Sequence, residues 1–469
     1  MKSYLIVGAL LLVIIALLAT NKKLVETVKN IFKIEELRKR LIYTCLLILV
    51  YRLGCYVVIP GIDPNLLGEG SALANQMDSN SLLGLLNVFS GGAFANAAIF
   101  ALGVMPYITA SIIIQLLGMM VPAVQKVMKE GESGRRKMNQ LTRYLTIIIL
   151  LIQGPAYMAN LHNQIPTSAF IATNVMGWSN FMFNLVSTLI LVGGTMFVMW
   201  LGERITDRGI GNGISLIIMV GIIARLPYAI VAEAGSKLSA TMGGALLLII
   251  EFVILFFVFI AAIALVQGVR RVPVQYAKRV VGNKQYGGVR QYIPLKINAA
   301  GVMPIIFAQA LMLFPLIFSQ FDATRGLAAT FSDYTGFWYN FTFAVLVIIF
   351  TYFYTAVTVN PTMMAEEMKK NGGFIPGVKP GKKTAEYMDA IMSRVTLPGS
   401  IFLALIAILP AFAMMLGVNN QFASFFGGTS LLILVGVVLD TLQQIESHLL
   451  MRHYDGLMKT GRLTGRSGL

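Results

Sequence analysis

The chain has 469 residues, of which 57% are hydrophobic and only 12% are charged. This composition excludes an ordinary soluble domain, in which about a quarter of the residues are charged. The formal net charge of +16 does not by itself indicate a nucleic-acid partner, because membrane proteins concentrate Lys and Arg in their cytoplasmic loops. The sequence therefore predicts an all-α polytopic membrane protein.

Apolar runs long enough to cross a bilayer as helices recur along the whole chain. They lie at 41–60, 96–120, 144–162, 182–201, 213–231, 244–267, 299–319, 337–359, 395–416 and 428–451. A further run at 4–19 would be about 24 Å long as a helix, which is marginal for spanning. We expect ten transmembrane helices. Residues 1–20 form either an extra hydrophobic helix or a stretch that is included only because the start site is set too far upstream.

The positive charges indicate the orientation of these helices. If the segment before residue 41 is cytoplasmic, the inner segments hold 32 of the 37 Lys and Arg residues. The positive-inside rule then places both ends of the ten-helix body in the cytoplasm, including the tail at 452–469. Residues 21–40 carry apolar positions at helical spacing among basic residues, so we expect a cytoplasmic amphipathic segment on the membrane surface.

Two short motifs occur twice in the same order. Gly103-Val104-Met105-Pro106 returns as Gly301-Val302-Met303-Pro304, and Gly213–Ile218 resembles Gly428–Ile433. With five helices in each half, the halves at 41–231 and 232–451 must run in opposite directions, which is typical of membrane proteins with a pathway between two repeats. Pro106 lies near the middle of the run 96–120, where we expect it to interrupt a helix.

The outer segment 61–95 contains a mildly apolar run, Ser81–Ser90, that is too short to cross the bilayer. Such a run is more often packed inside the protein. Gly91 and Gly92 follow it and predict a hinge. We therefore expect this segment to fold back into the space between the two halves.

Catalytic and metal-binding patterns are missing from the sequence. His162, His448 and His453 have no metal-ligand spacing, and no nucleophile or paired-carboxylate motif occurs. The glycines of Gly209–Gly213 do not fit the spacing of a phosphate-binding loop. We expect no enzyme activity, no catalytic residue, no metal and no cofactor.

Ionisable residues inside the predicted helices are sparse, and coupled transport usually requires them. Arg52, Glu251 and Asp440 are the candidates, and each could equally be a structural charge. A secondary transporter for a small solute, built from inverted repeats, remains the alternative to a passive channel. The long inner loops at 268–298 and 360–394 together carry thirteen basic residues, which favours a docking surface for a cytosolic partner.

Several longer motifs together resemble the SecY family, the protein-conducting channels of the general secretory pathway. They are FSGGA (89–93), ALGVMPYITASIIIQLL (101–117), KEGESGRRK (129–137), GGTMFVMWLGERITDRGIGNGIS (193–215), QYAKR (275–279), PLKINAAGVMP (294–304), FIPGVKPG (374–381) and GGTSLLI (427–433). The resemblance covers nearly all of the chain from Leu37 to Tyr454. It implies a bacterial inner-membrane channel that passes unfolded preproteins and releases transmembrane segments into lipid.

The resemblance also implies roles for individual residues. A pore ring would consist of Val104, Ile108, Ile218, Ile222, Ile306 and Ile433. The plug would include Ser81, Leu82, Leu83, Leu85 and Leu86. Thr109, Gln115, Asn298 and Phe314 would lie at the lateral gate, where polar groups are expected to hold the closed gate by hydrogen bonds that a signal sequence displaces.

Docking of partners is implied for the basic inner loops. The residues expected to take part are Arg270, Arg271, Lys278, Arg279, Lys284 and Lys379. Lys379 stands where the family usually has arginine, which keeps the charge and loses the two-pronged contact of a guanidinium. The implied partners are the SecE and SecG membrane subunits, the SecA motor, the ribosome, signal sequences and preproteins, and membrane lipid.

Overall fold

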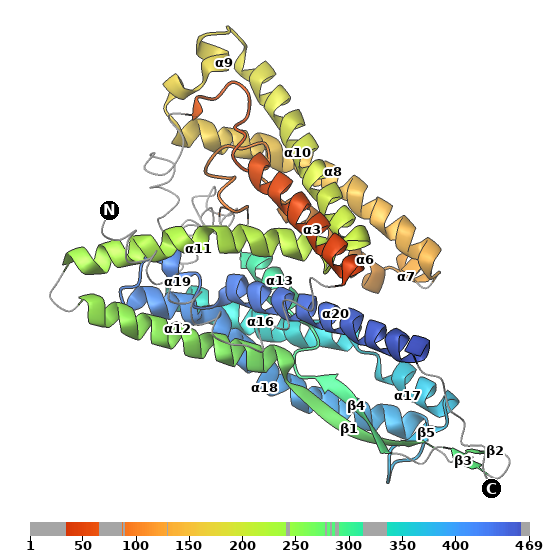
Figure 1. Ribbon diagram of the computed structural model, residues 1–469. Coiled ribbons are helices and arrows are strands. Elements are labelled where there is room, and N and C mark those ends of the chain that lie inside the picture. Colours follow the sequence, from red (N-terminus) through yellow and green to blue (C-terminus); the bar gives the residue numbers. More distant parts are fainter. Residues whose placement is uncertain are drawn as a thin grey trace. The chain divides into compact units, whose positions relative to one another are not determined.

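The structure is a computed structural model that describes residues 34–64, 87, 90–128, 130–240, 244–276, 279–281, 284–286, 290–312 and 335–460 (Figure 1). It is predominantly helical and divides into two compact units. Unit 1 comprises Met1–Ser236 with Val437–Leu469, and unit 2 comprises Lys237–Gly436. Each unit is described by itself below. The apolar run at 4–19 and the predicted plug residues lie outside the described residues.

Unit 1 is built from long helices and short connecting elements. Its helices are α3 (Glu35–Gly54), α6 (Met105–Met120), α7 (Pro122–Met128), α8 (Glu132–Gln164), α9 (Ile171–Asn174), α10 (Asn180–Arg208) and most of α11 (Gly213–Ala240), with the 3₁₀ turn η2 (Thr167–Ala169) before α9. The second part of α20 (Gly428–Thr460) also belongs to it. Helix α10 packs against both α8 and α3, and α6 packs against α8.

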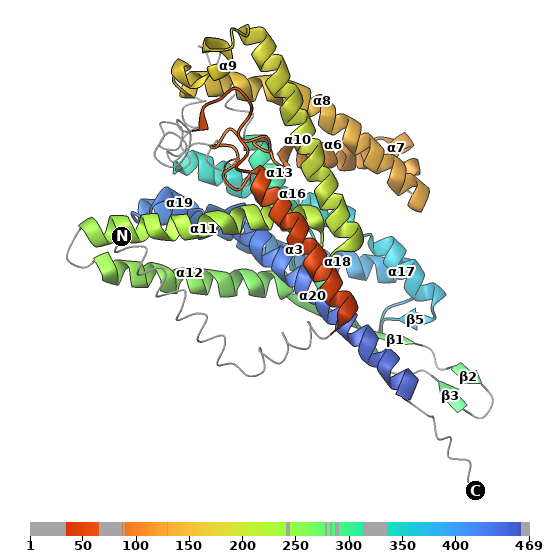
Figure 2. The ribbon, with the colours of Figure 1, turned by 45° about the horizontal axis from the view of Figure 1, so that its top comes forward.

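Unit 2 combines membrane-length helices with a small sheet. Its elements are α12 (Gly244–Gln267), β1 (Val269–Tyr276), β2 (Arg279–Val281), β3 (Lys284–Tyr286), β4 (Arg290–Lys296), α13 (Met303–Met312), α16 (Phe337–Thr358), α17 (Pro361–Lys370), β5 (Gly373–Phe374), α18 (Lys382–Met415), α19 (Asn420–Ala423) and the start of α20. Helices α16 and α18 lie side by side (Figures 1 and 2). Helix α13 packs on α16, and α17 packs on α18.

Seven of the described helices are long and apolar enough to cross a membrane. They are α8, α10, α11, α12, α16, α18 and α20. Helix α6 contains a shorter apolar stretch, Met105–Gly118. These helices confirm the predicted class, a helical polytopic membrane protein. The count of ten spans and the extra helix at the amino end stay predictions.

The first described helix differs from its predicted bounds. The prediction assigned 41–60 to a spanning helix and 21–40 to a separate surface segment, but α3 begins at Glu35 and ends at Gly54. Its first turns are polar and carry Lys39–Glu35 and Arg40–Glu36 ion pairs at 2.8 and 3.4 Å. Leu37 from these turns is buried with Ile210 and Ile445. Residues 35–40 therefore belong to α3, and the cytoplasmic amphipathic segment stays a prediction.

The proline of the first repeat, Pro106, does not interrupt a helix, so the expectation of an interrupted helix over 96–120 is wrong. Residues 101–104 form turns, α6 begins at Met105, and Pro106 occupies its first turn. A proline is favourable there because the first amides of a helix have no partner within the helix. The prediction failed because an apolar run does not distinguish tightly folded turns from helix.

The inner loop 268–298 contains strands that the all-helical prediction did not include. Strand β1 pairs antiparallel with β4 from Val269↔Lys296 to Gln275↔Arg290, and β5 pairs with the other edge of β1. Val272, Val274 and Leu295 form a buried cluster with methionines of α17 and α18. The alternation of buried and exposed residues in Val269–Tyr276 is the period-two pattern of a half-buried strand.

Candidate functional site

Both copies of the proline motif begin a helix in the same way. Gly103 and Gly301 have positive φ angles of 54° and 66°, and α6 and α13 start two residues later. Only glycine adopts this backbone conformation readily. The motif is thus a turn followed by a helix start in each unit. Ile108 and Ile306, two residues after the prolines, occupy equivalent places near the start of their helices.

The second repeat shows the same correspondence. Helix α11 begins at Gly213 and α20 begins at Gly428, so both motifs open a long apolar helix. Four of the predicted pore-ring residues, Val104, Ile108, Ile218 and Ile222, belong to unit 1, and Ile306 and Ile433 belong to unit 2. Ile222 is fully buried and Ile433 is 5% exposed.

The described end of the predicted plug contacts the part of unit 1 that carries ring residues. A methyl group on Gly91 would lie 2.9 Å from the Cα of Gly221, which is in α11 next to Ile222 and one turn after Ile218. A methyl group on Gly103, next to Val104, would lie 3.6 Å from the Cα of Ser90. Ser90 and Gly91 therefore lie close to two segments that bear predicted ring residues.

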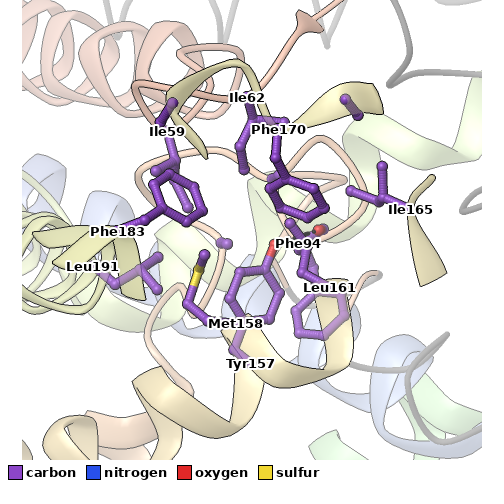
Figure 3. Packing of buried hydrophobic residues seen from close by; sticks show 14 of the residues in the cluster. Ile59, Ile62, Phe94, Tyr157, Met158, Leu161, Ile165, Phe170, Phe183 and Leu191 are labelled. Atoms are coloured by element: carbon purple, nitrogen blue, oxygen red, sulfur yellow. Dashed lines mark hydrogen bonds between the residues drawn. The ribbon is translucent and has the colours of Figure 1, made fainter. Parts of the chain in front are cut away.

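A hydrophobic core fixes the turns that follow Gly91. Phe94 packs with Tyr157 and Leu161 of α8 in a buried cluster that also takes Ile59 and Phe183 (Figure 3). The Tyr157 hydroxyl donates a hydrogen bond of 2.9 Å to the Phe94 carbonyl, and the two rings meet edge to face at 4.8 Å. Residues 93–104 thus form packed turns that lead into α6.

Two of the predicted gate residues, Thr109 and Gln115, each donate a hydrogen bond within α6. Thr109 Oγ1 donates to the Met105 carbonyl over 3.1 Å, and Gln115 Nε2 donates to Ser111 Oγ over 3.3 Å. Asn298 is 9% exposed, and its Oδ1 accepts no hydrogen bond within the described part of the chain. Phe314 lies outside that part. The expected hydrogen bonds across the gate stay a prediction.

The predicted docking residues lie around the small sheet and the turn before α18. Arg270 and Arg271 on β1 and Lys379 in the turn are exposed. Arg279 and Lys284 belong to the hairpin β2–β3, and Lys278 lies outside the described residues. The register pairs Arg271 with Pro294.

The start of α18 borders this region and is polar. Lys383 Nζ lies 2.9 Å from a carboxylate oxygen of Glu386 in the first turns of α18, before its apolar part. The Glu386 carboxylate therefore offsets part of the positive charge of Lys382 and Lys383.

The glycine-rich segment 209–213 is not an anion site. The Ile210 amide donates to Thr44 Oγ1 over 3.2 Å, the Gly211 amide to Gln444 Oε1 over 2.9 Å, and the Gly213 amide to Thr206 Oγ1 over 2.9 Å. These amides are the groups that a phosphate would need. They instead hold the loop between α10 and α11 in unit 1.

Two of the three predicted intramembrane charges, Glu251 and Arg52, have a partner within their own unit. Glu251 is paired with Lys237 at 3.0 Å, and the two side chains are 10% and 15% exposed. Asp440 is exposed, and Arg52 binds a backbone carbonyl. Within the described ranges no three His, Cys, Asp or Glu residues come together as a metal site. Sequence reasoning singled out Arg52 but missed its contact with Gly91.

The repeated motifs each start an apolar helix, and the long apolar helices of both units define a helical polytopic membrane protein. The SecY family model matches residues 98–442. A protein translocase subunit SecY from Streptomyces scabiei is 44% identical over 91% of this chain and 98% of its own length. Another from Chlamydia trachomatis is 39% identical over 94% and 99%. The chain belongs to the SecY family.

Solved channels support the same fold. "The structure of a protein conducting channel" matches with a TM-score of 0.55 and 16% identity, covering 88% of this chain and 93% of that one. Sec61 in the canine ribosome-channel complex matches with a TM-score of 0.53 and 15% identity over 88% and 93%. At this identity the structures bear on the fold alone. Membership of a protein-conducting family does not support the transporter alternative.

Proposed function

We propose that this protein is the central channel subunit of a bacterial Sec translocon, which passes unfolded preproteins across the cytoplasmic membrane and releases transmembrane segments sideways into lipid. The packing of Ser90 and Gly91 against Gly103 and Gly221 carries the proposal. A segment held beside Val104, Ile218 and Ile222 is well placed to close a pore that these side chains line. Deformable apolar side chains exclude water yet bind no passing sequence strongly.

The lateral gate is proposed between α6, which carries Thr109 and Gln115, and the predicted run 299–319, which includes Phe314 and follows Asn298. Asn298 supports this part, because its buried Oδ1, which accepts no hydrogen bond within the described residues, is free to accept one from a donor at the gate. A cysteine pair at Thr109 and Phe314 should form a disulfide in the resting channel and block translocation. A pair that never crosslinks, in channels that are otherwise active, would overturn the gate assignment.

Partners are proposed from the charge of unit 2. Exposed Arg270, Arg271 and Lys379 favour an acidic or phosphate-rich cytosolic partner, such as the ribosome or the SecA motor. SecE and SecG are the proposed membrane subunits. The cytoplasmic position of both ends of the ten-helix body follows from the distribution of Lys and Arg.

The proposed function is tested by reconstitution. The purified chain, with the small membrane proteins that co-purify with it, is placed in proteoliposomes and given SecA, ATP and an unfolded preprotein. The proposal expects ATP-dependent protection of the preprotein from external protease. Saturable uptake of a small solute by the chain alone, without preprotein protection, would favour a transporter instead.

A further inference from the structure

The loop between α10 and α11 is held in unit 1 by side chains from three different helices. Three of its backbone amides donate hydrogen bonds to side-chain oxygens of α3, α10 and α20. The pairs are Ile210 with Thr44, Gly213 with Thr206, and Gly211 with Gln444. A buried amide without a partner is costly, so the loop depends on these three oxygens. We call the loop Gly209–Gly213 with these three side chains the α10–α11 joint.

The two threonines of the joint can act toward the loop only as acceptors. Each hydroxyl donates its only hydrogen to a carbonyl of its own helix, over 2.9 Å for Thr44 and 3.0 Å for Thr206. The remaining lone pairs accept from the amides of Ile210 and Gly213. Thr44 is 6% exposed, and its bond to the loop is buried. Loss of the Thr44 oxygen would therefore leave the Ile210 amide unsatisfied.

The glycines let the loop approach its neighbours closely enough for these bonds. A methyl group on Gly209 would collide with Thr44 Oγ1. Gly211 has a φ of 81°, which side chains other than glycine rarely adopt. Ile210 between them is buried in a cluster with Leu37 of α3 and Ile445 of α20. The glycine spacing thus serves a tight joint between helices.

Helix α11 begins directly at this joint and carries two of the predicted ring residues. Ile218 and Ile222 lie about 8 and 14 Å along the helix axis from Gly213, one turn apart on the same face. Successive helical residues are turned by about 100°. A small rotation or shift at the start of α11 is therefore carried along the helix to both side chains.

We propose that Thr44, Thr206 and Gln444 are positioning residues of the channel, which fix the start of α11 and thereby set the height and rotation at which Ile218 and Ile222 line the pore. This inference rests on the proposed channel function. The three oxygens belong to separate helices, so together they restrain the loop in more than one direction. Removal of one acceptor should displace the lining and weaken the seal against ions.

The test compares resting ion conductance in planar bilayers for the reconstituted complex. Thr44→Val keeps the shape of the side chain and removes the acceptor, whereas Thr44→Ser keeps the acceptor. An unsatisfied buried amide changes a local equilibrium about tenfold. We therefore expect Thr44→Val to raise the conductance about tenfold and Thr44→Ser to leave it close to the wild-type value.

A second pair of variants tests the joint at its exposed side, where folding is less at risk. Gln444 is exposed as a residue, and its Oε1 accepts from the Gly211 amide over 2.9 Å. Gln444→Leu removes this acceptor and should raise resting conductance. Gln444→Glu keeps an oxygen in its place and should not.

Thr146→Val is the matched control. Thr146 of α8 is fully buried, and its hydroxyl donates to the Thr142 carbonyl of its own helix over 2.7 Å. Within the described residues it accepts no hydrogen bond from another element. The control thus makes the same substitution at a buried threonine outside the joint, and it should leave resting conductance unchanged.

Preprotein translocation by each variant distinguishes a failure of the joint from a failure of the proposed function. If the wild type does not translocate, the proposed function fails. If the wild type translocates while Thr44→Val and Gln444→Leu conduct no more than Thr146→Val, the positioning role is refuted and the function stands. Equal increases in Thr44→Val and Thr44→Ser would also refute it, since the acceptor would then have no effect.

Discussion

Replacing Glu251 by glutamine should destabilise the protein without abolishing transport of preproteins. Glu251 lies 3.0 Å from Lys237, and both side chains are almost buried. Breaking a buried ion pair by removing one partner typically costs about 3–5 kcal/mol, because the remaining charge is left in a poor environment. Lys237 also donates to the Gly417 carbonyl at 2.9 Å, so we expect the lower end, about 3 kcal/mol.

Removing both charges should restore most of this loss. One oxygen of Glu251 accepts no hydrogen bond within the described residues, so the pair is only partly satisfied and an apolar replacement should be tolerated. We therefore expect Lys237→Met with Glu251→Leu to lie within about 1 kcal/mol of the wild type. The assay is thermal unfolding of the purified complex in detergent, followed by preprotein translocation in proteoliposomes.

Two results would contradict this reasoning. A double variant less stable than either single variant would show that the two charges do not act as a pair. A double variant of normal stability that no longer translocates would show that Glu251 has a role in coupling, as the transporter alternative required. The surface variant Glu366→Gln on α17 is the control, since Glu366 is exposed and forms no salt bridge within the described part of the chain.

Three further outcomes are expected. Tyr157→Phe leaves the Phe94 carbonyl without its hydrogen bond and should lower the free energy of unfolding by about 1–3 kcal/mol, which urea or thermal unfolding measures; no change would argue against the packing of these turns. Ile433→Asn should raise resting ion leak in planar bilayers, and unchanged conductance would remove Ile433 from the ring. Arg270→Glu with Arg271→Glu should weaken ribosome binding and flatten its salt dependence, and an unaltered salt dependence would exclude this docking role.

The sequence predicted the class and most long helices because apolar runs determine both. Helix α12, predicted at 244–267, has the same bounds in the structure. The prediction from sequence failed where apolar residues form packed turns. Nothing in the run 96–120 shows that contacts with Tyr157 and Ser90 keep residues 93–104 from forming a helix. Gly103 before Pro106 was the available signal, since glycine at a turn and proline in a first helical turn together indicate a helix start.

The small sheet was missed for a different reason. Residues 269–276 alternate in the way a half-buried strand does, but their arginines were interpreted only as a charged surface. The strands position these arginines on an ordered platform over α17 and α18. The partner of Arg52 could not be predicted from the sequence, because Arg52 and Gly91 are 39 positions apart and only the fold brings them together.

The path of a translocating chain is the most direct test of a pore lined by the six predicted ring residues. A photo-crosslinking amino acid is placed, one position at a time, at Val104, Ile108, Ile218, Ile222, Ile306 and Ile433, and a preprotein is arrested halfway through the reconstituted channel. Ile249 and Phe256 of α12, which are 60% and 62% exposed, are the controls. We expect crosslinks from all six positions and none from the controls. Crosslinks from α12 alone, or from none of the six, would contradict a channel lined by these residues.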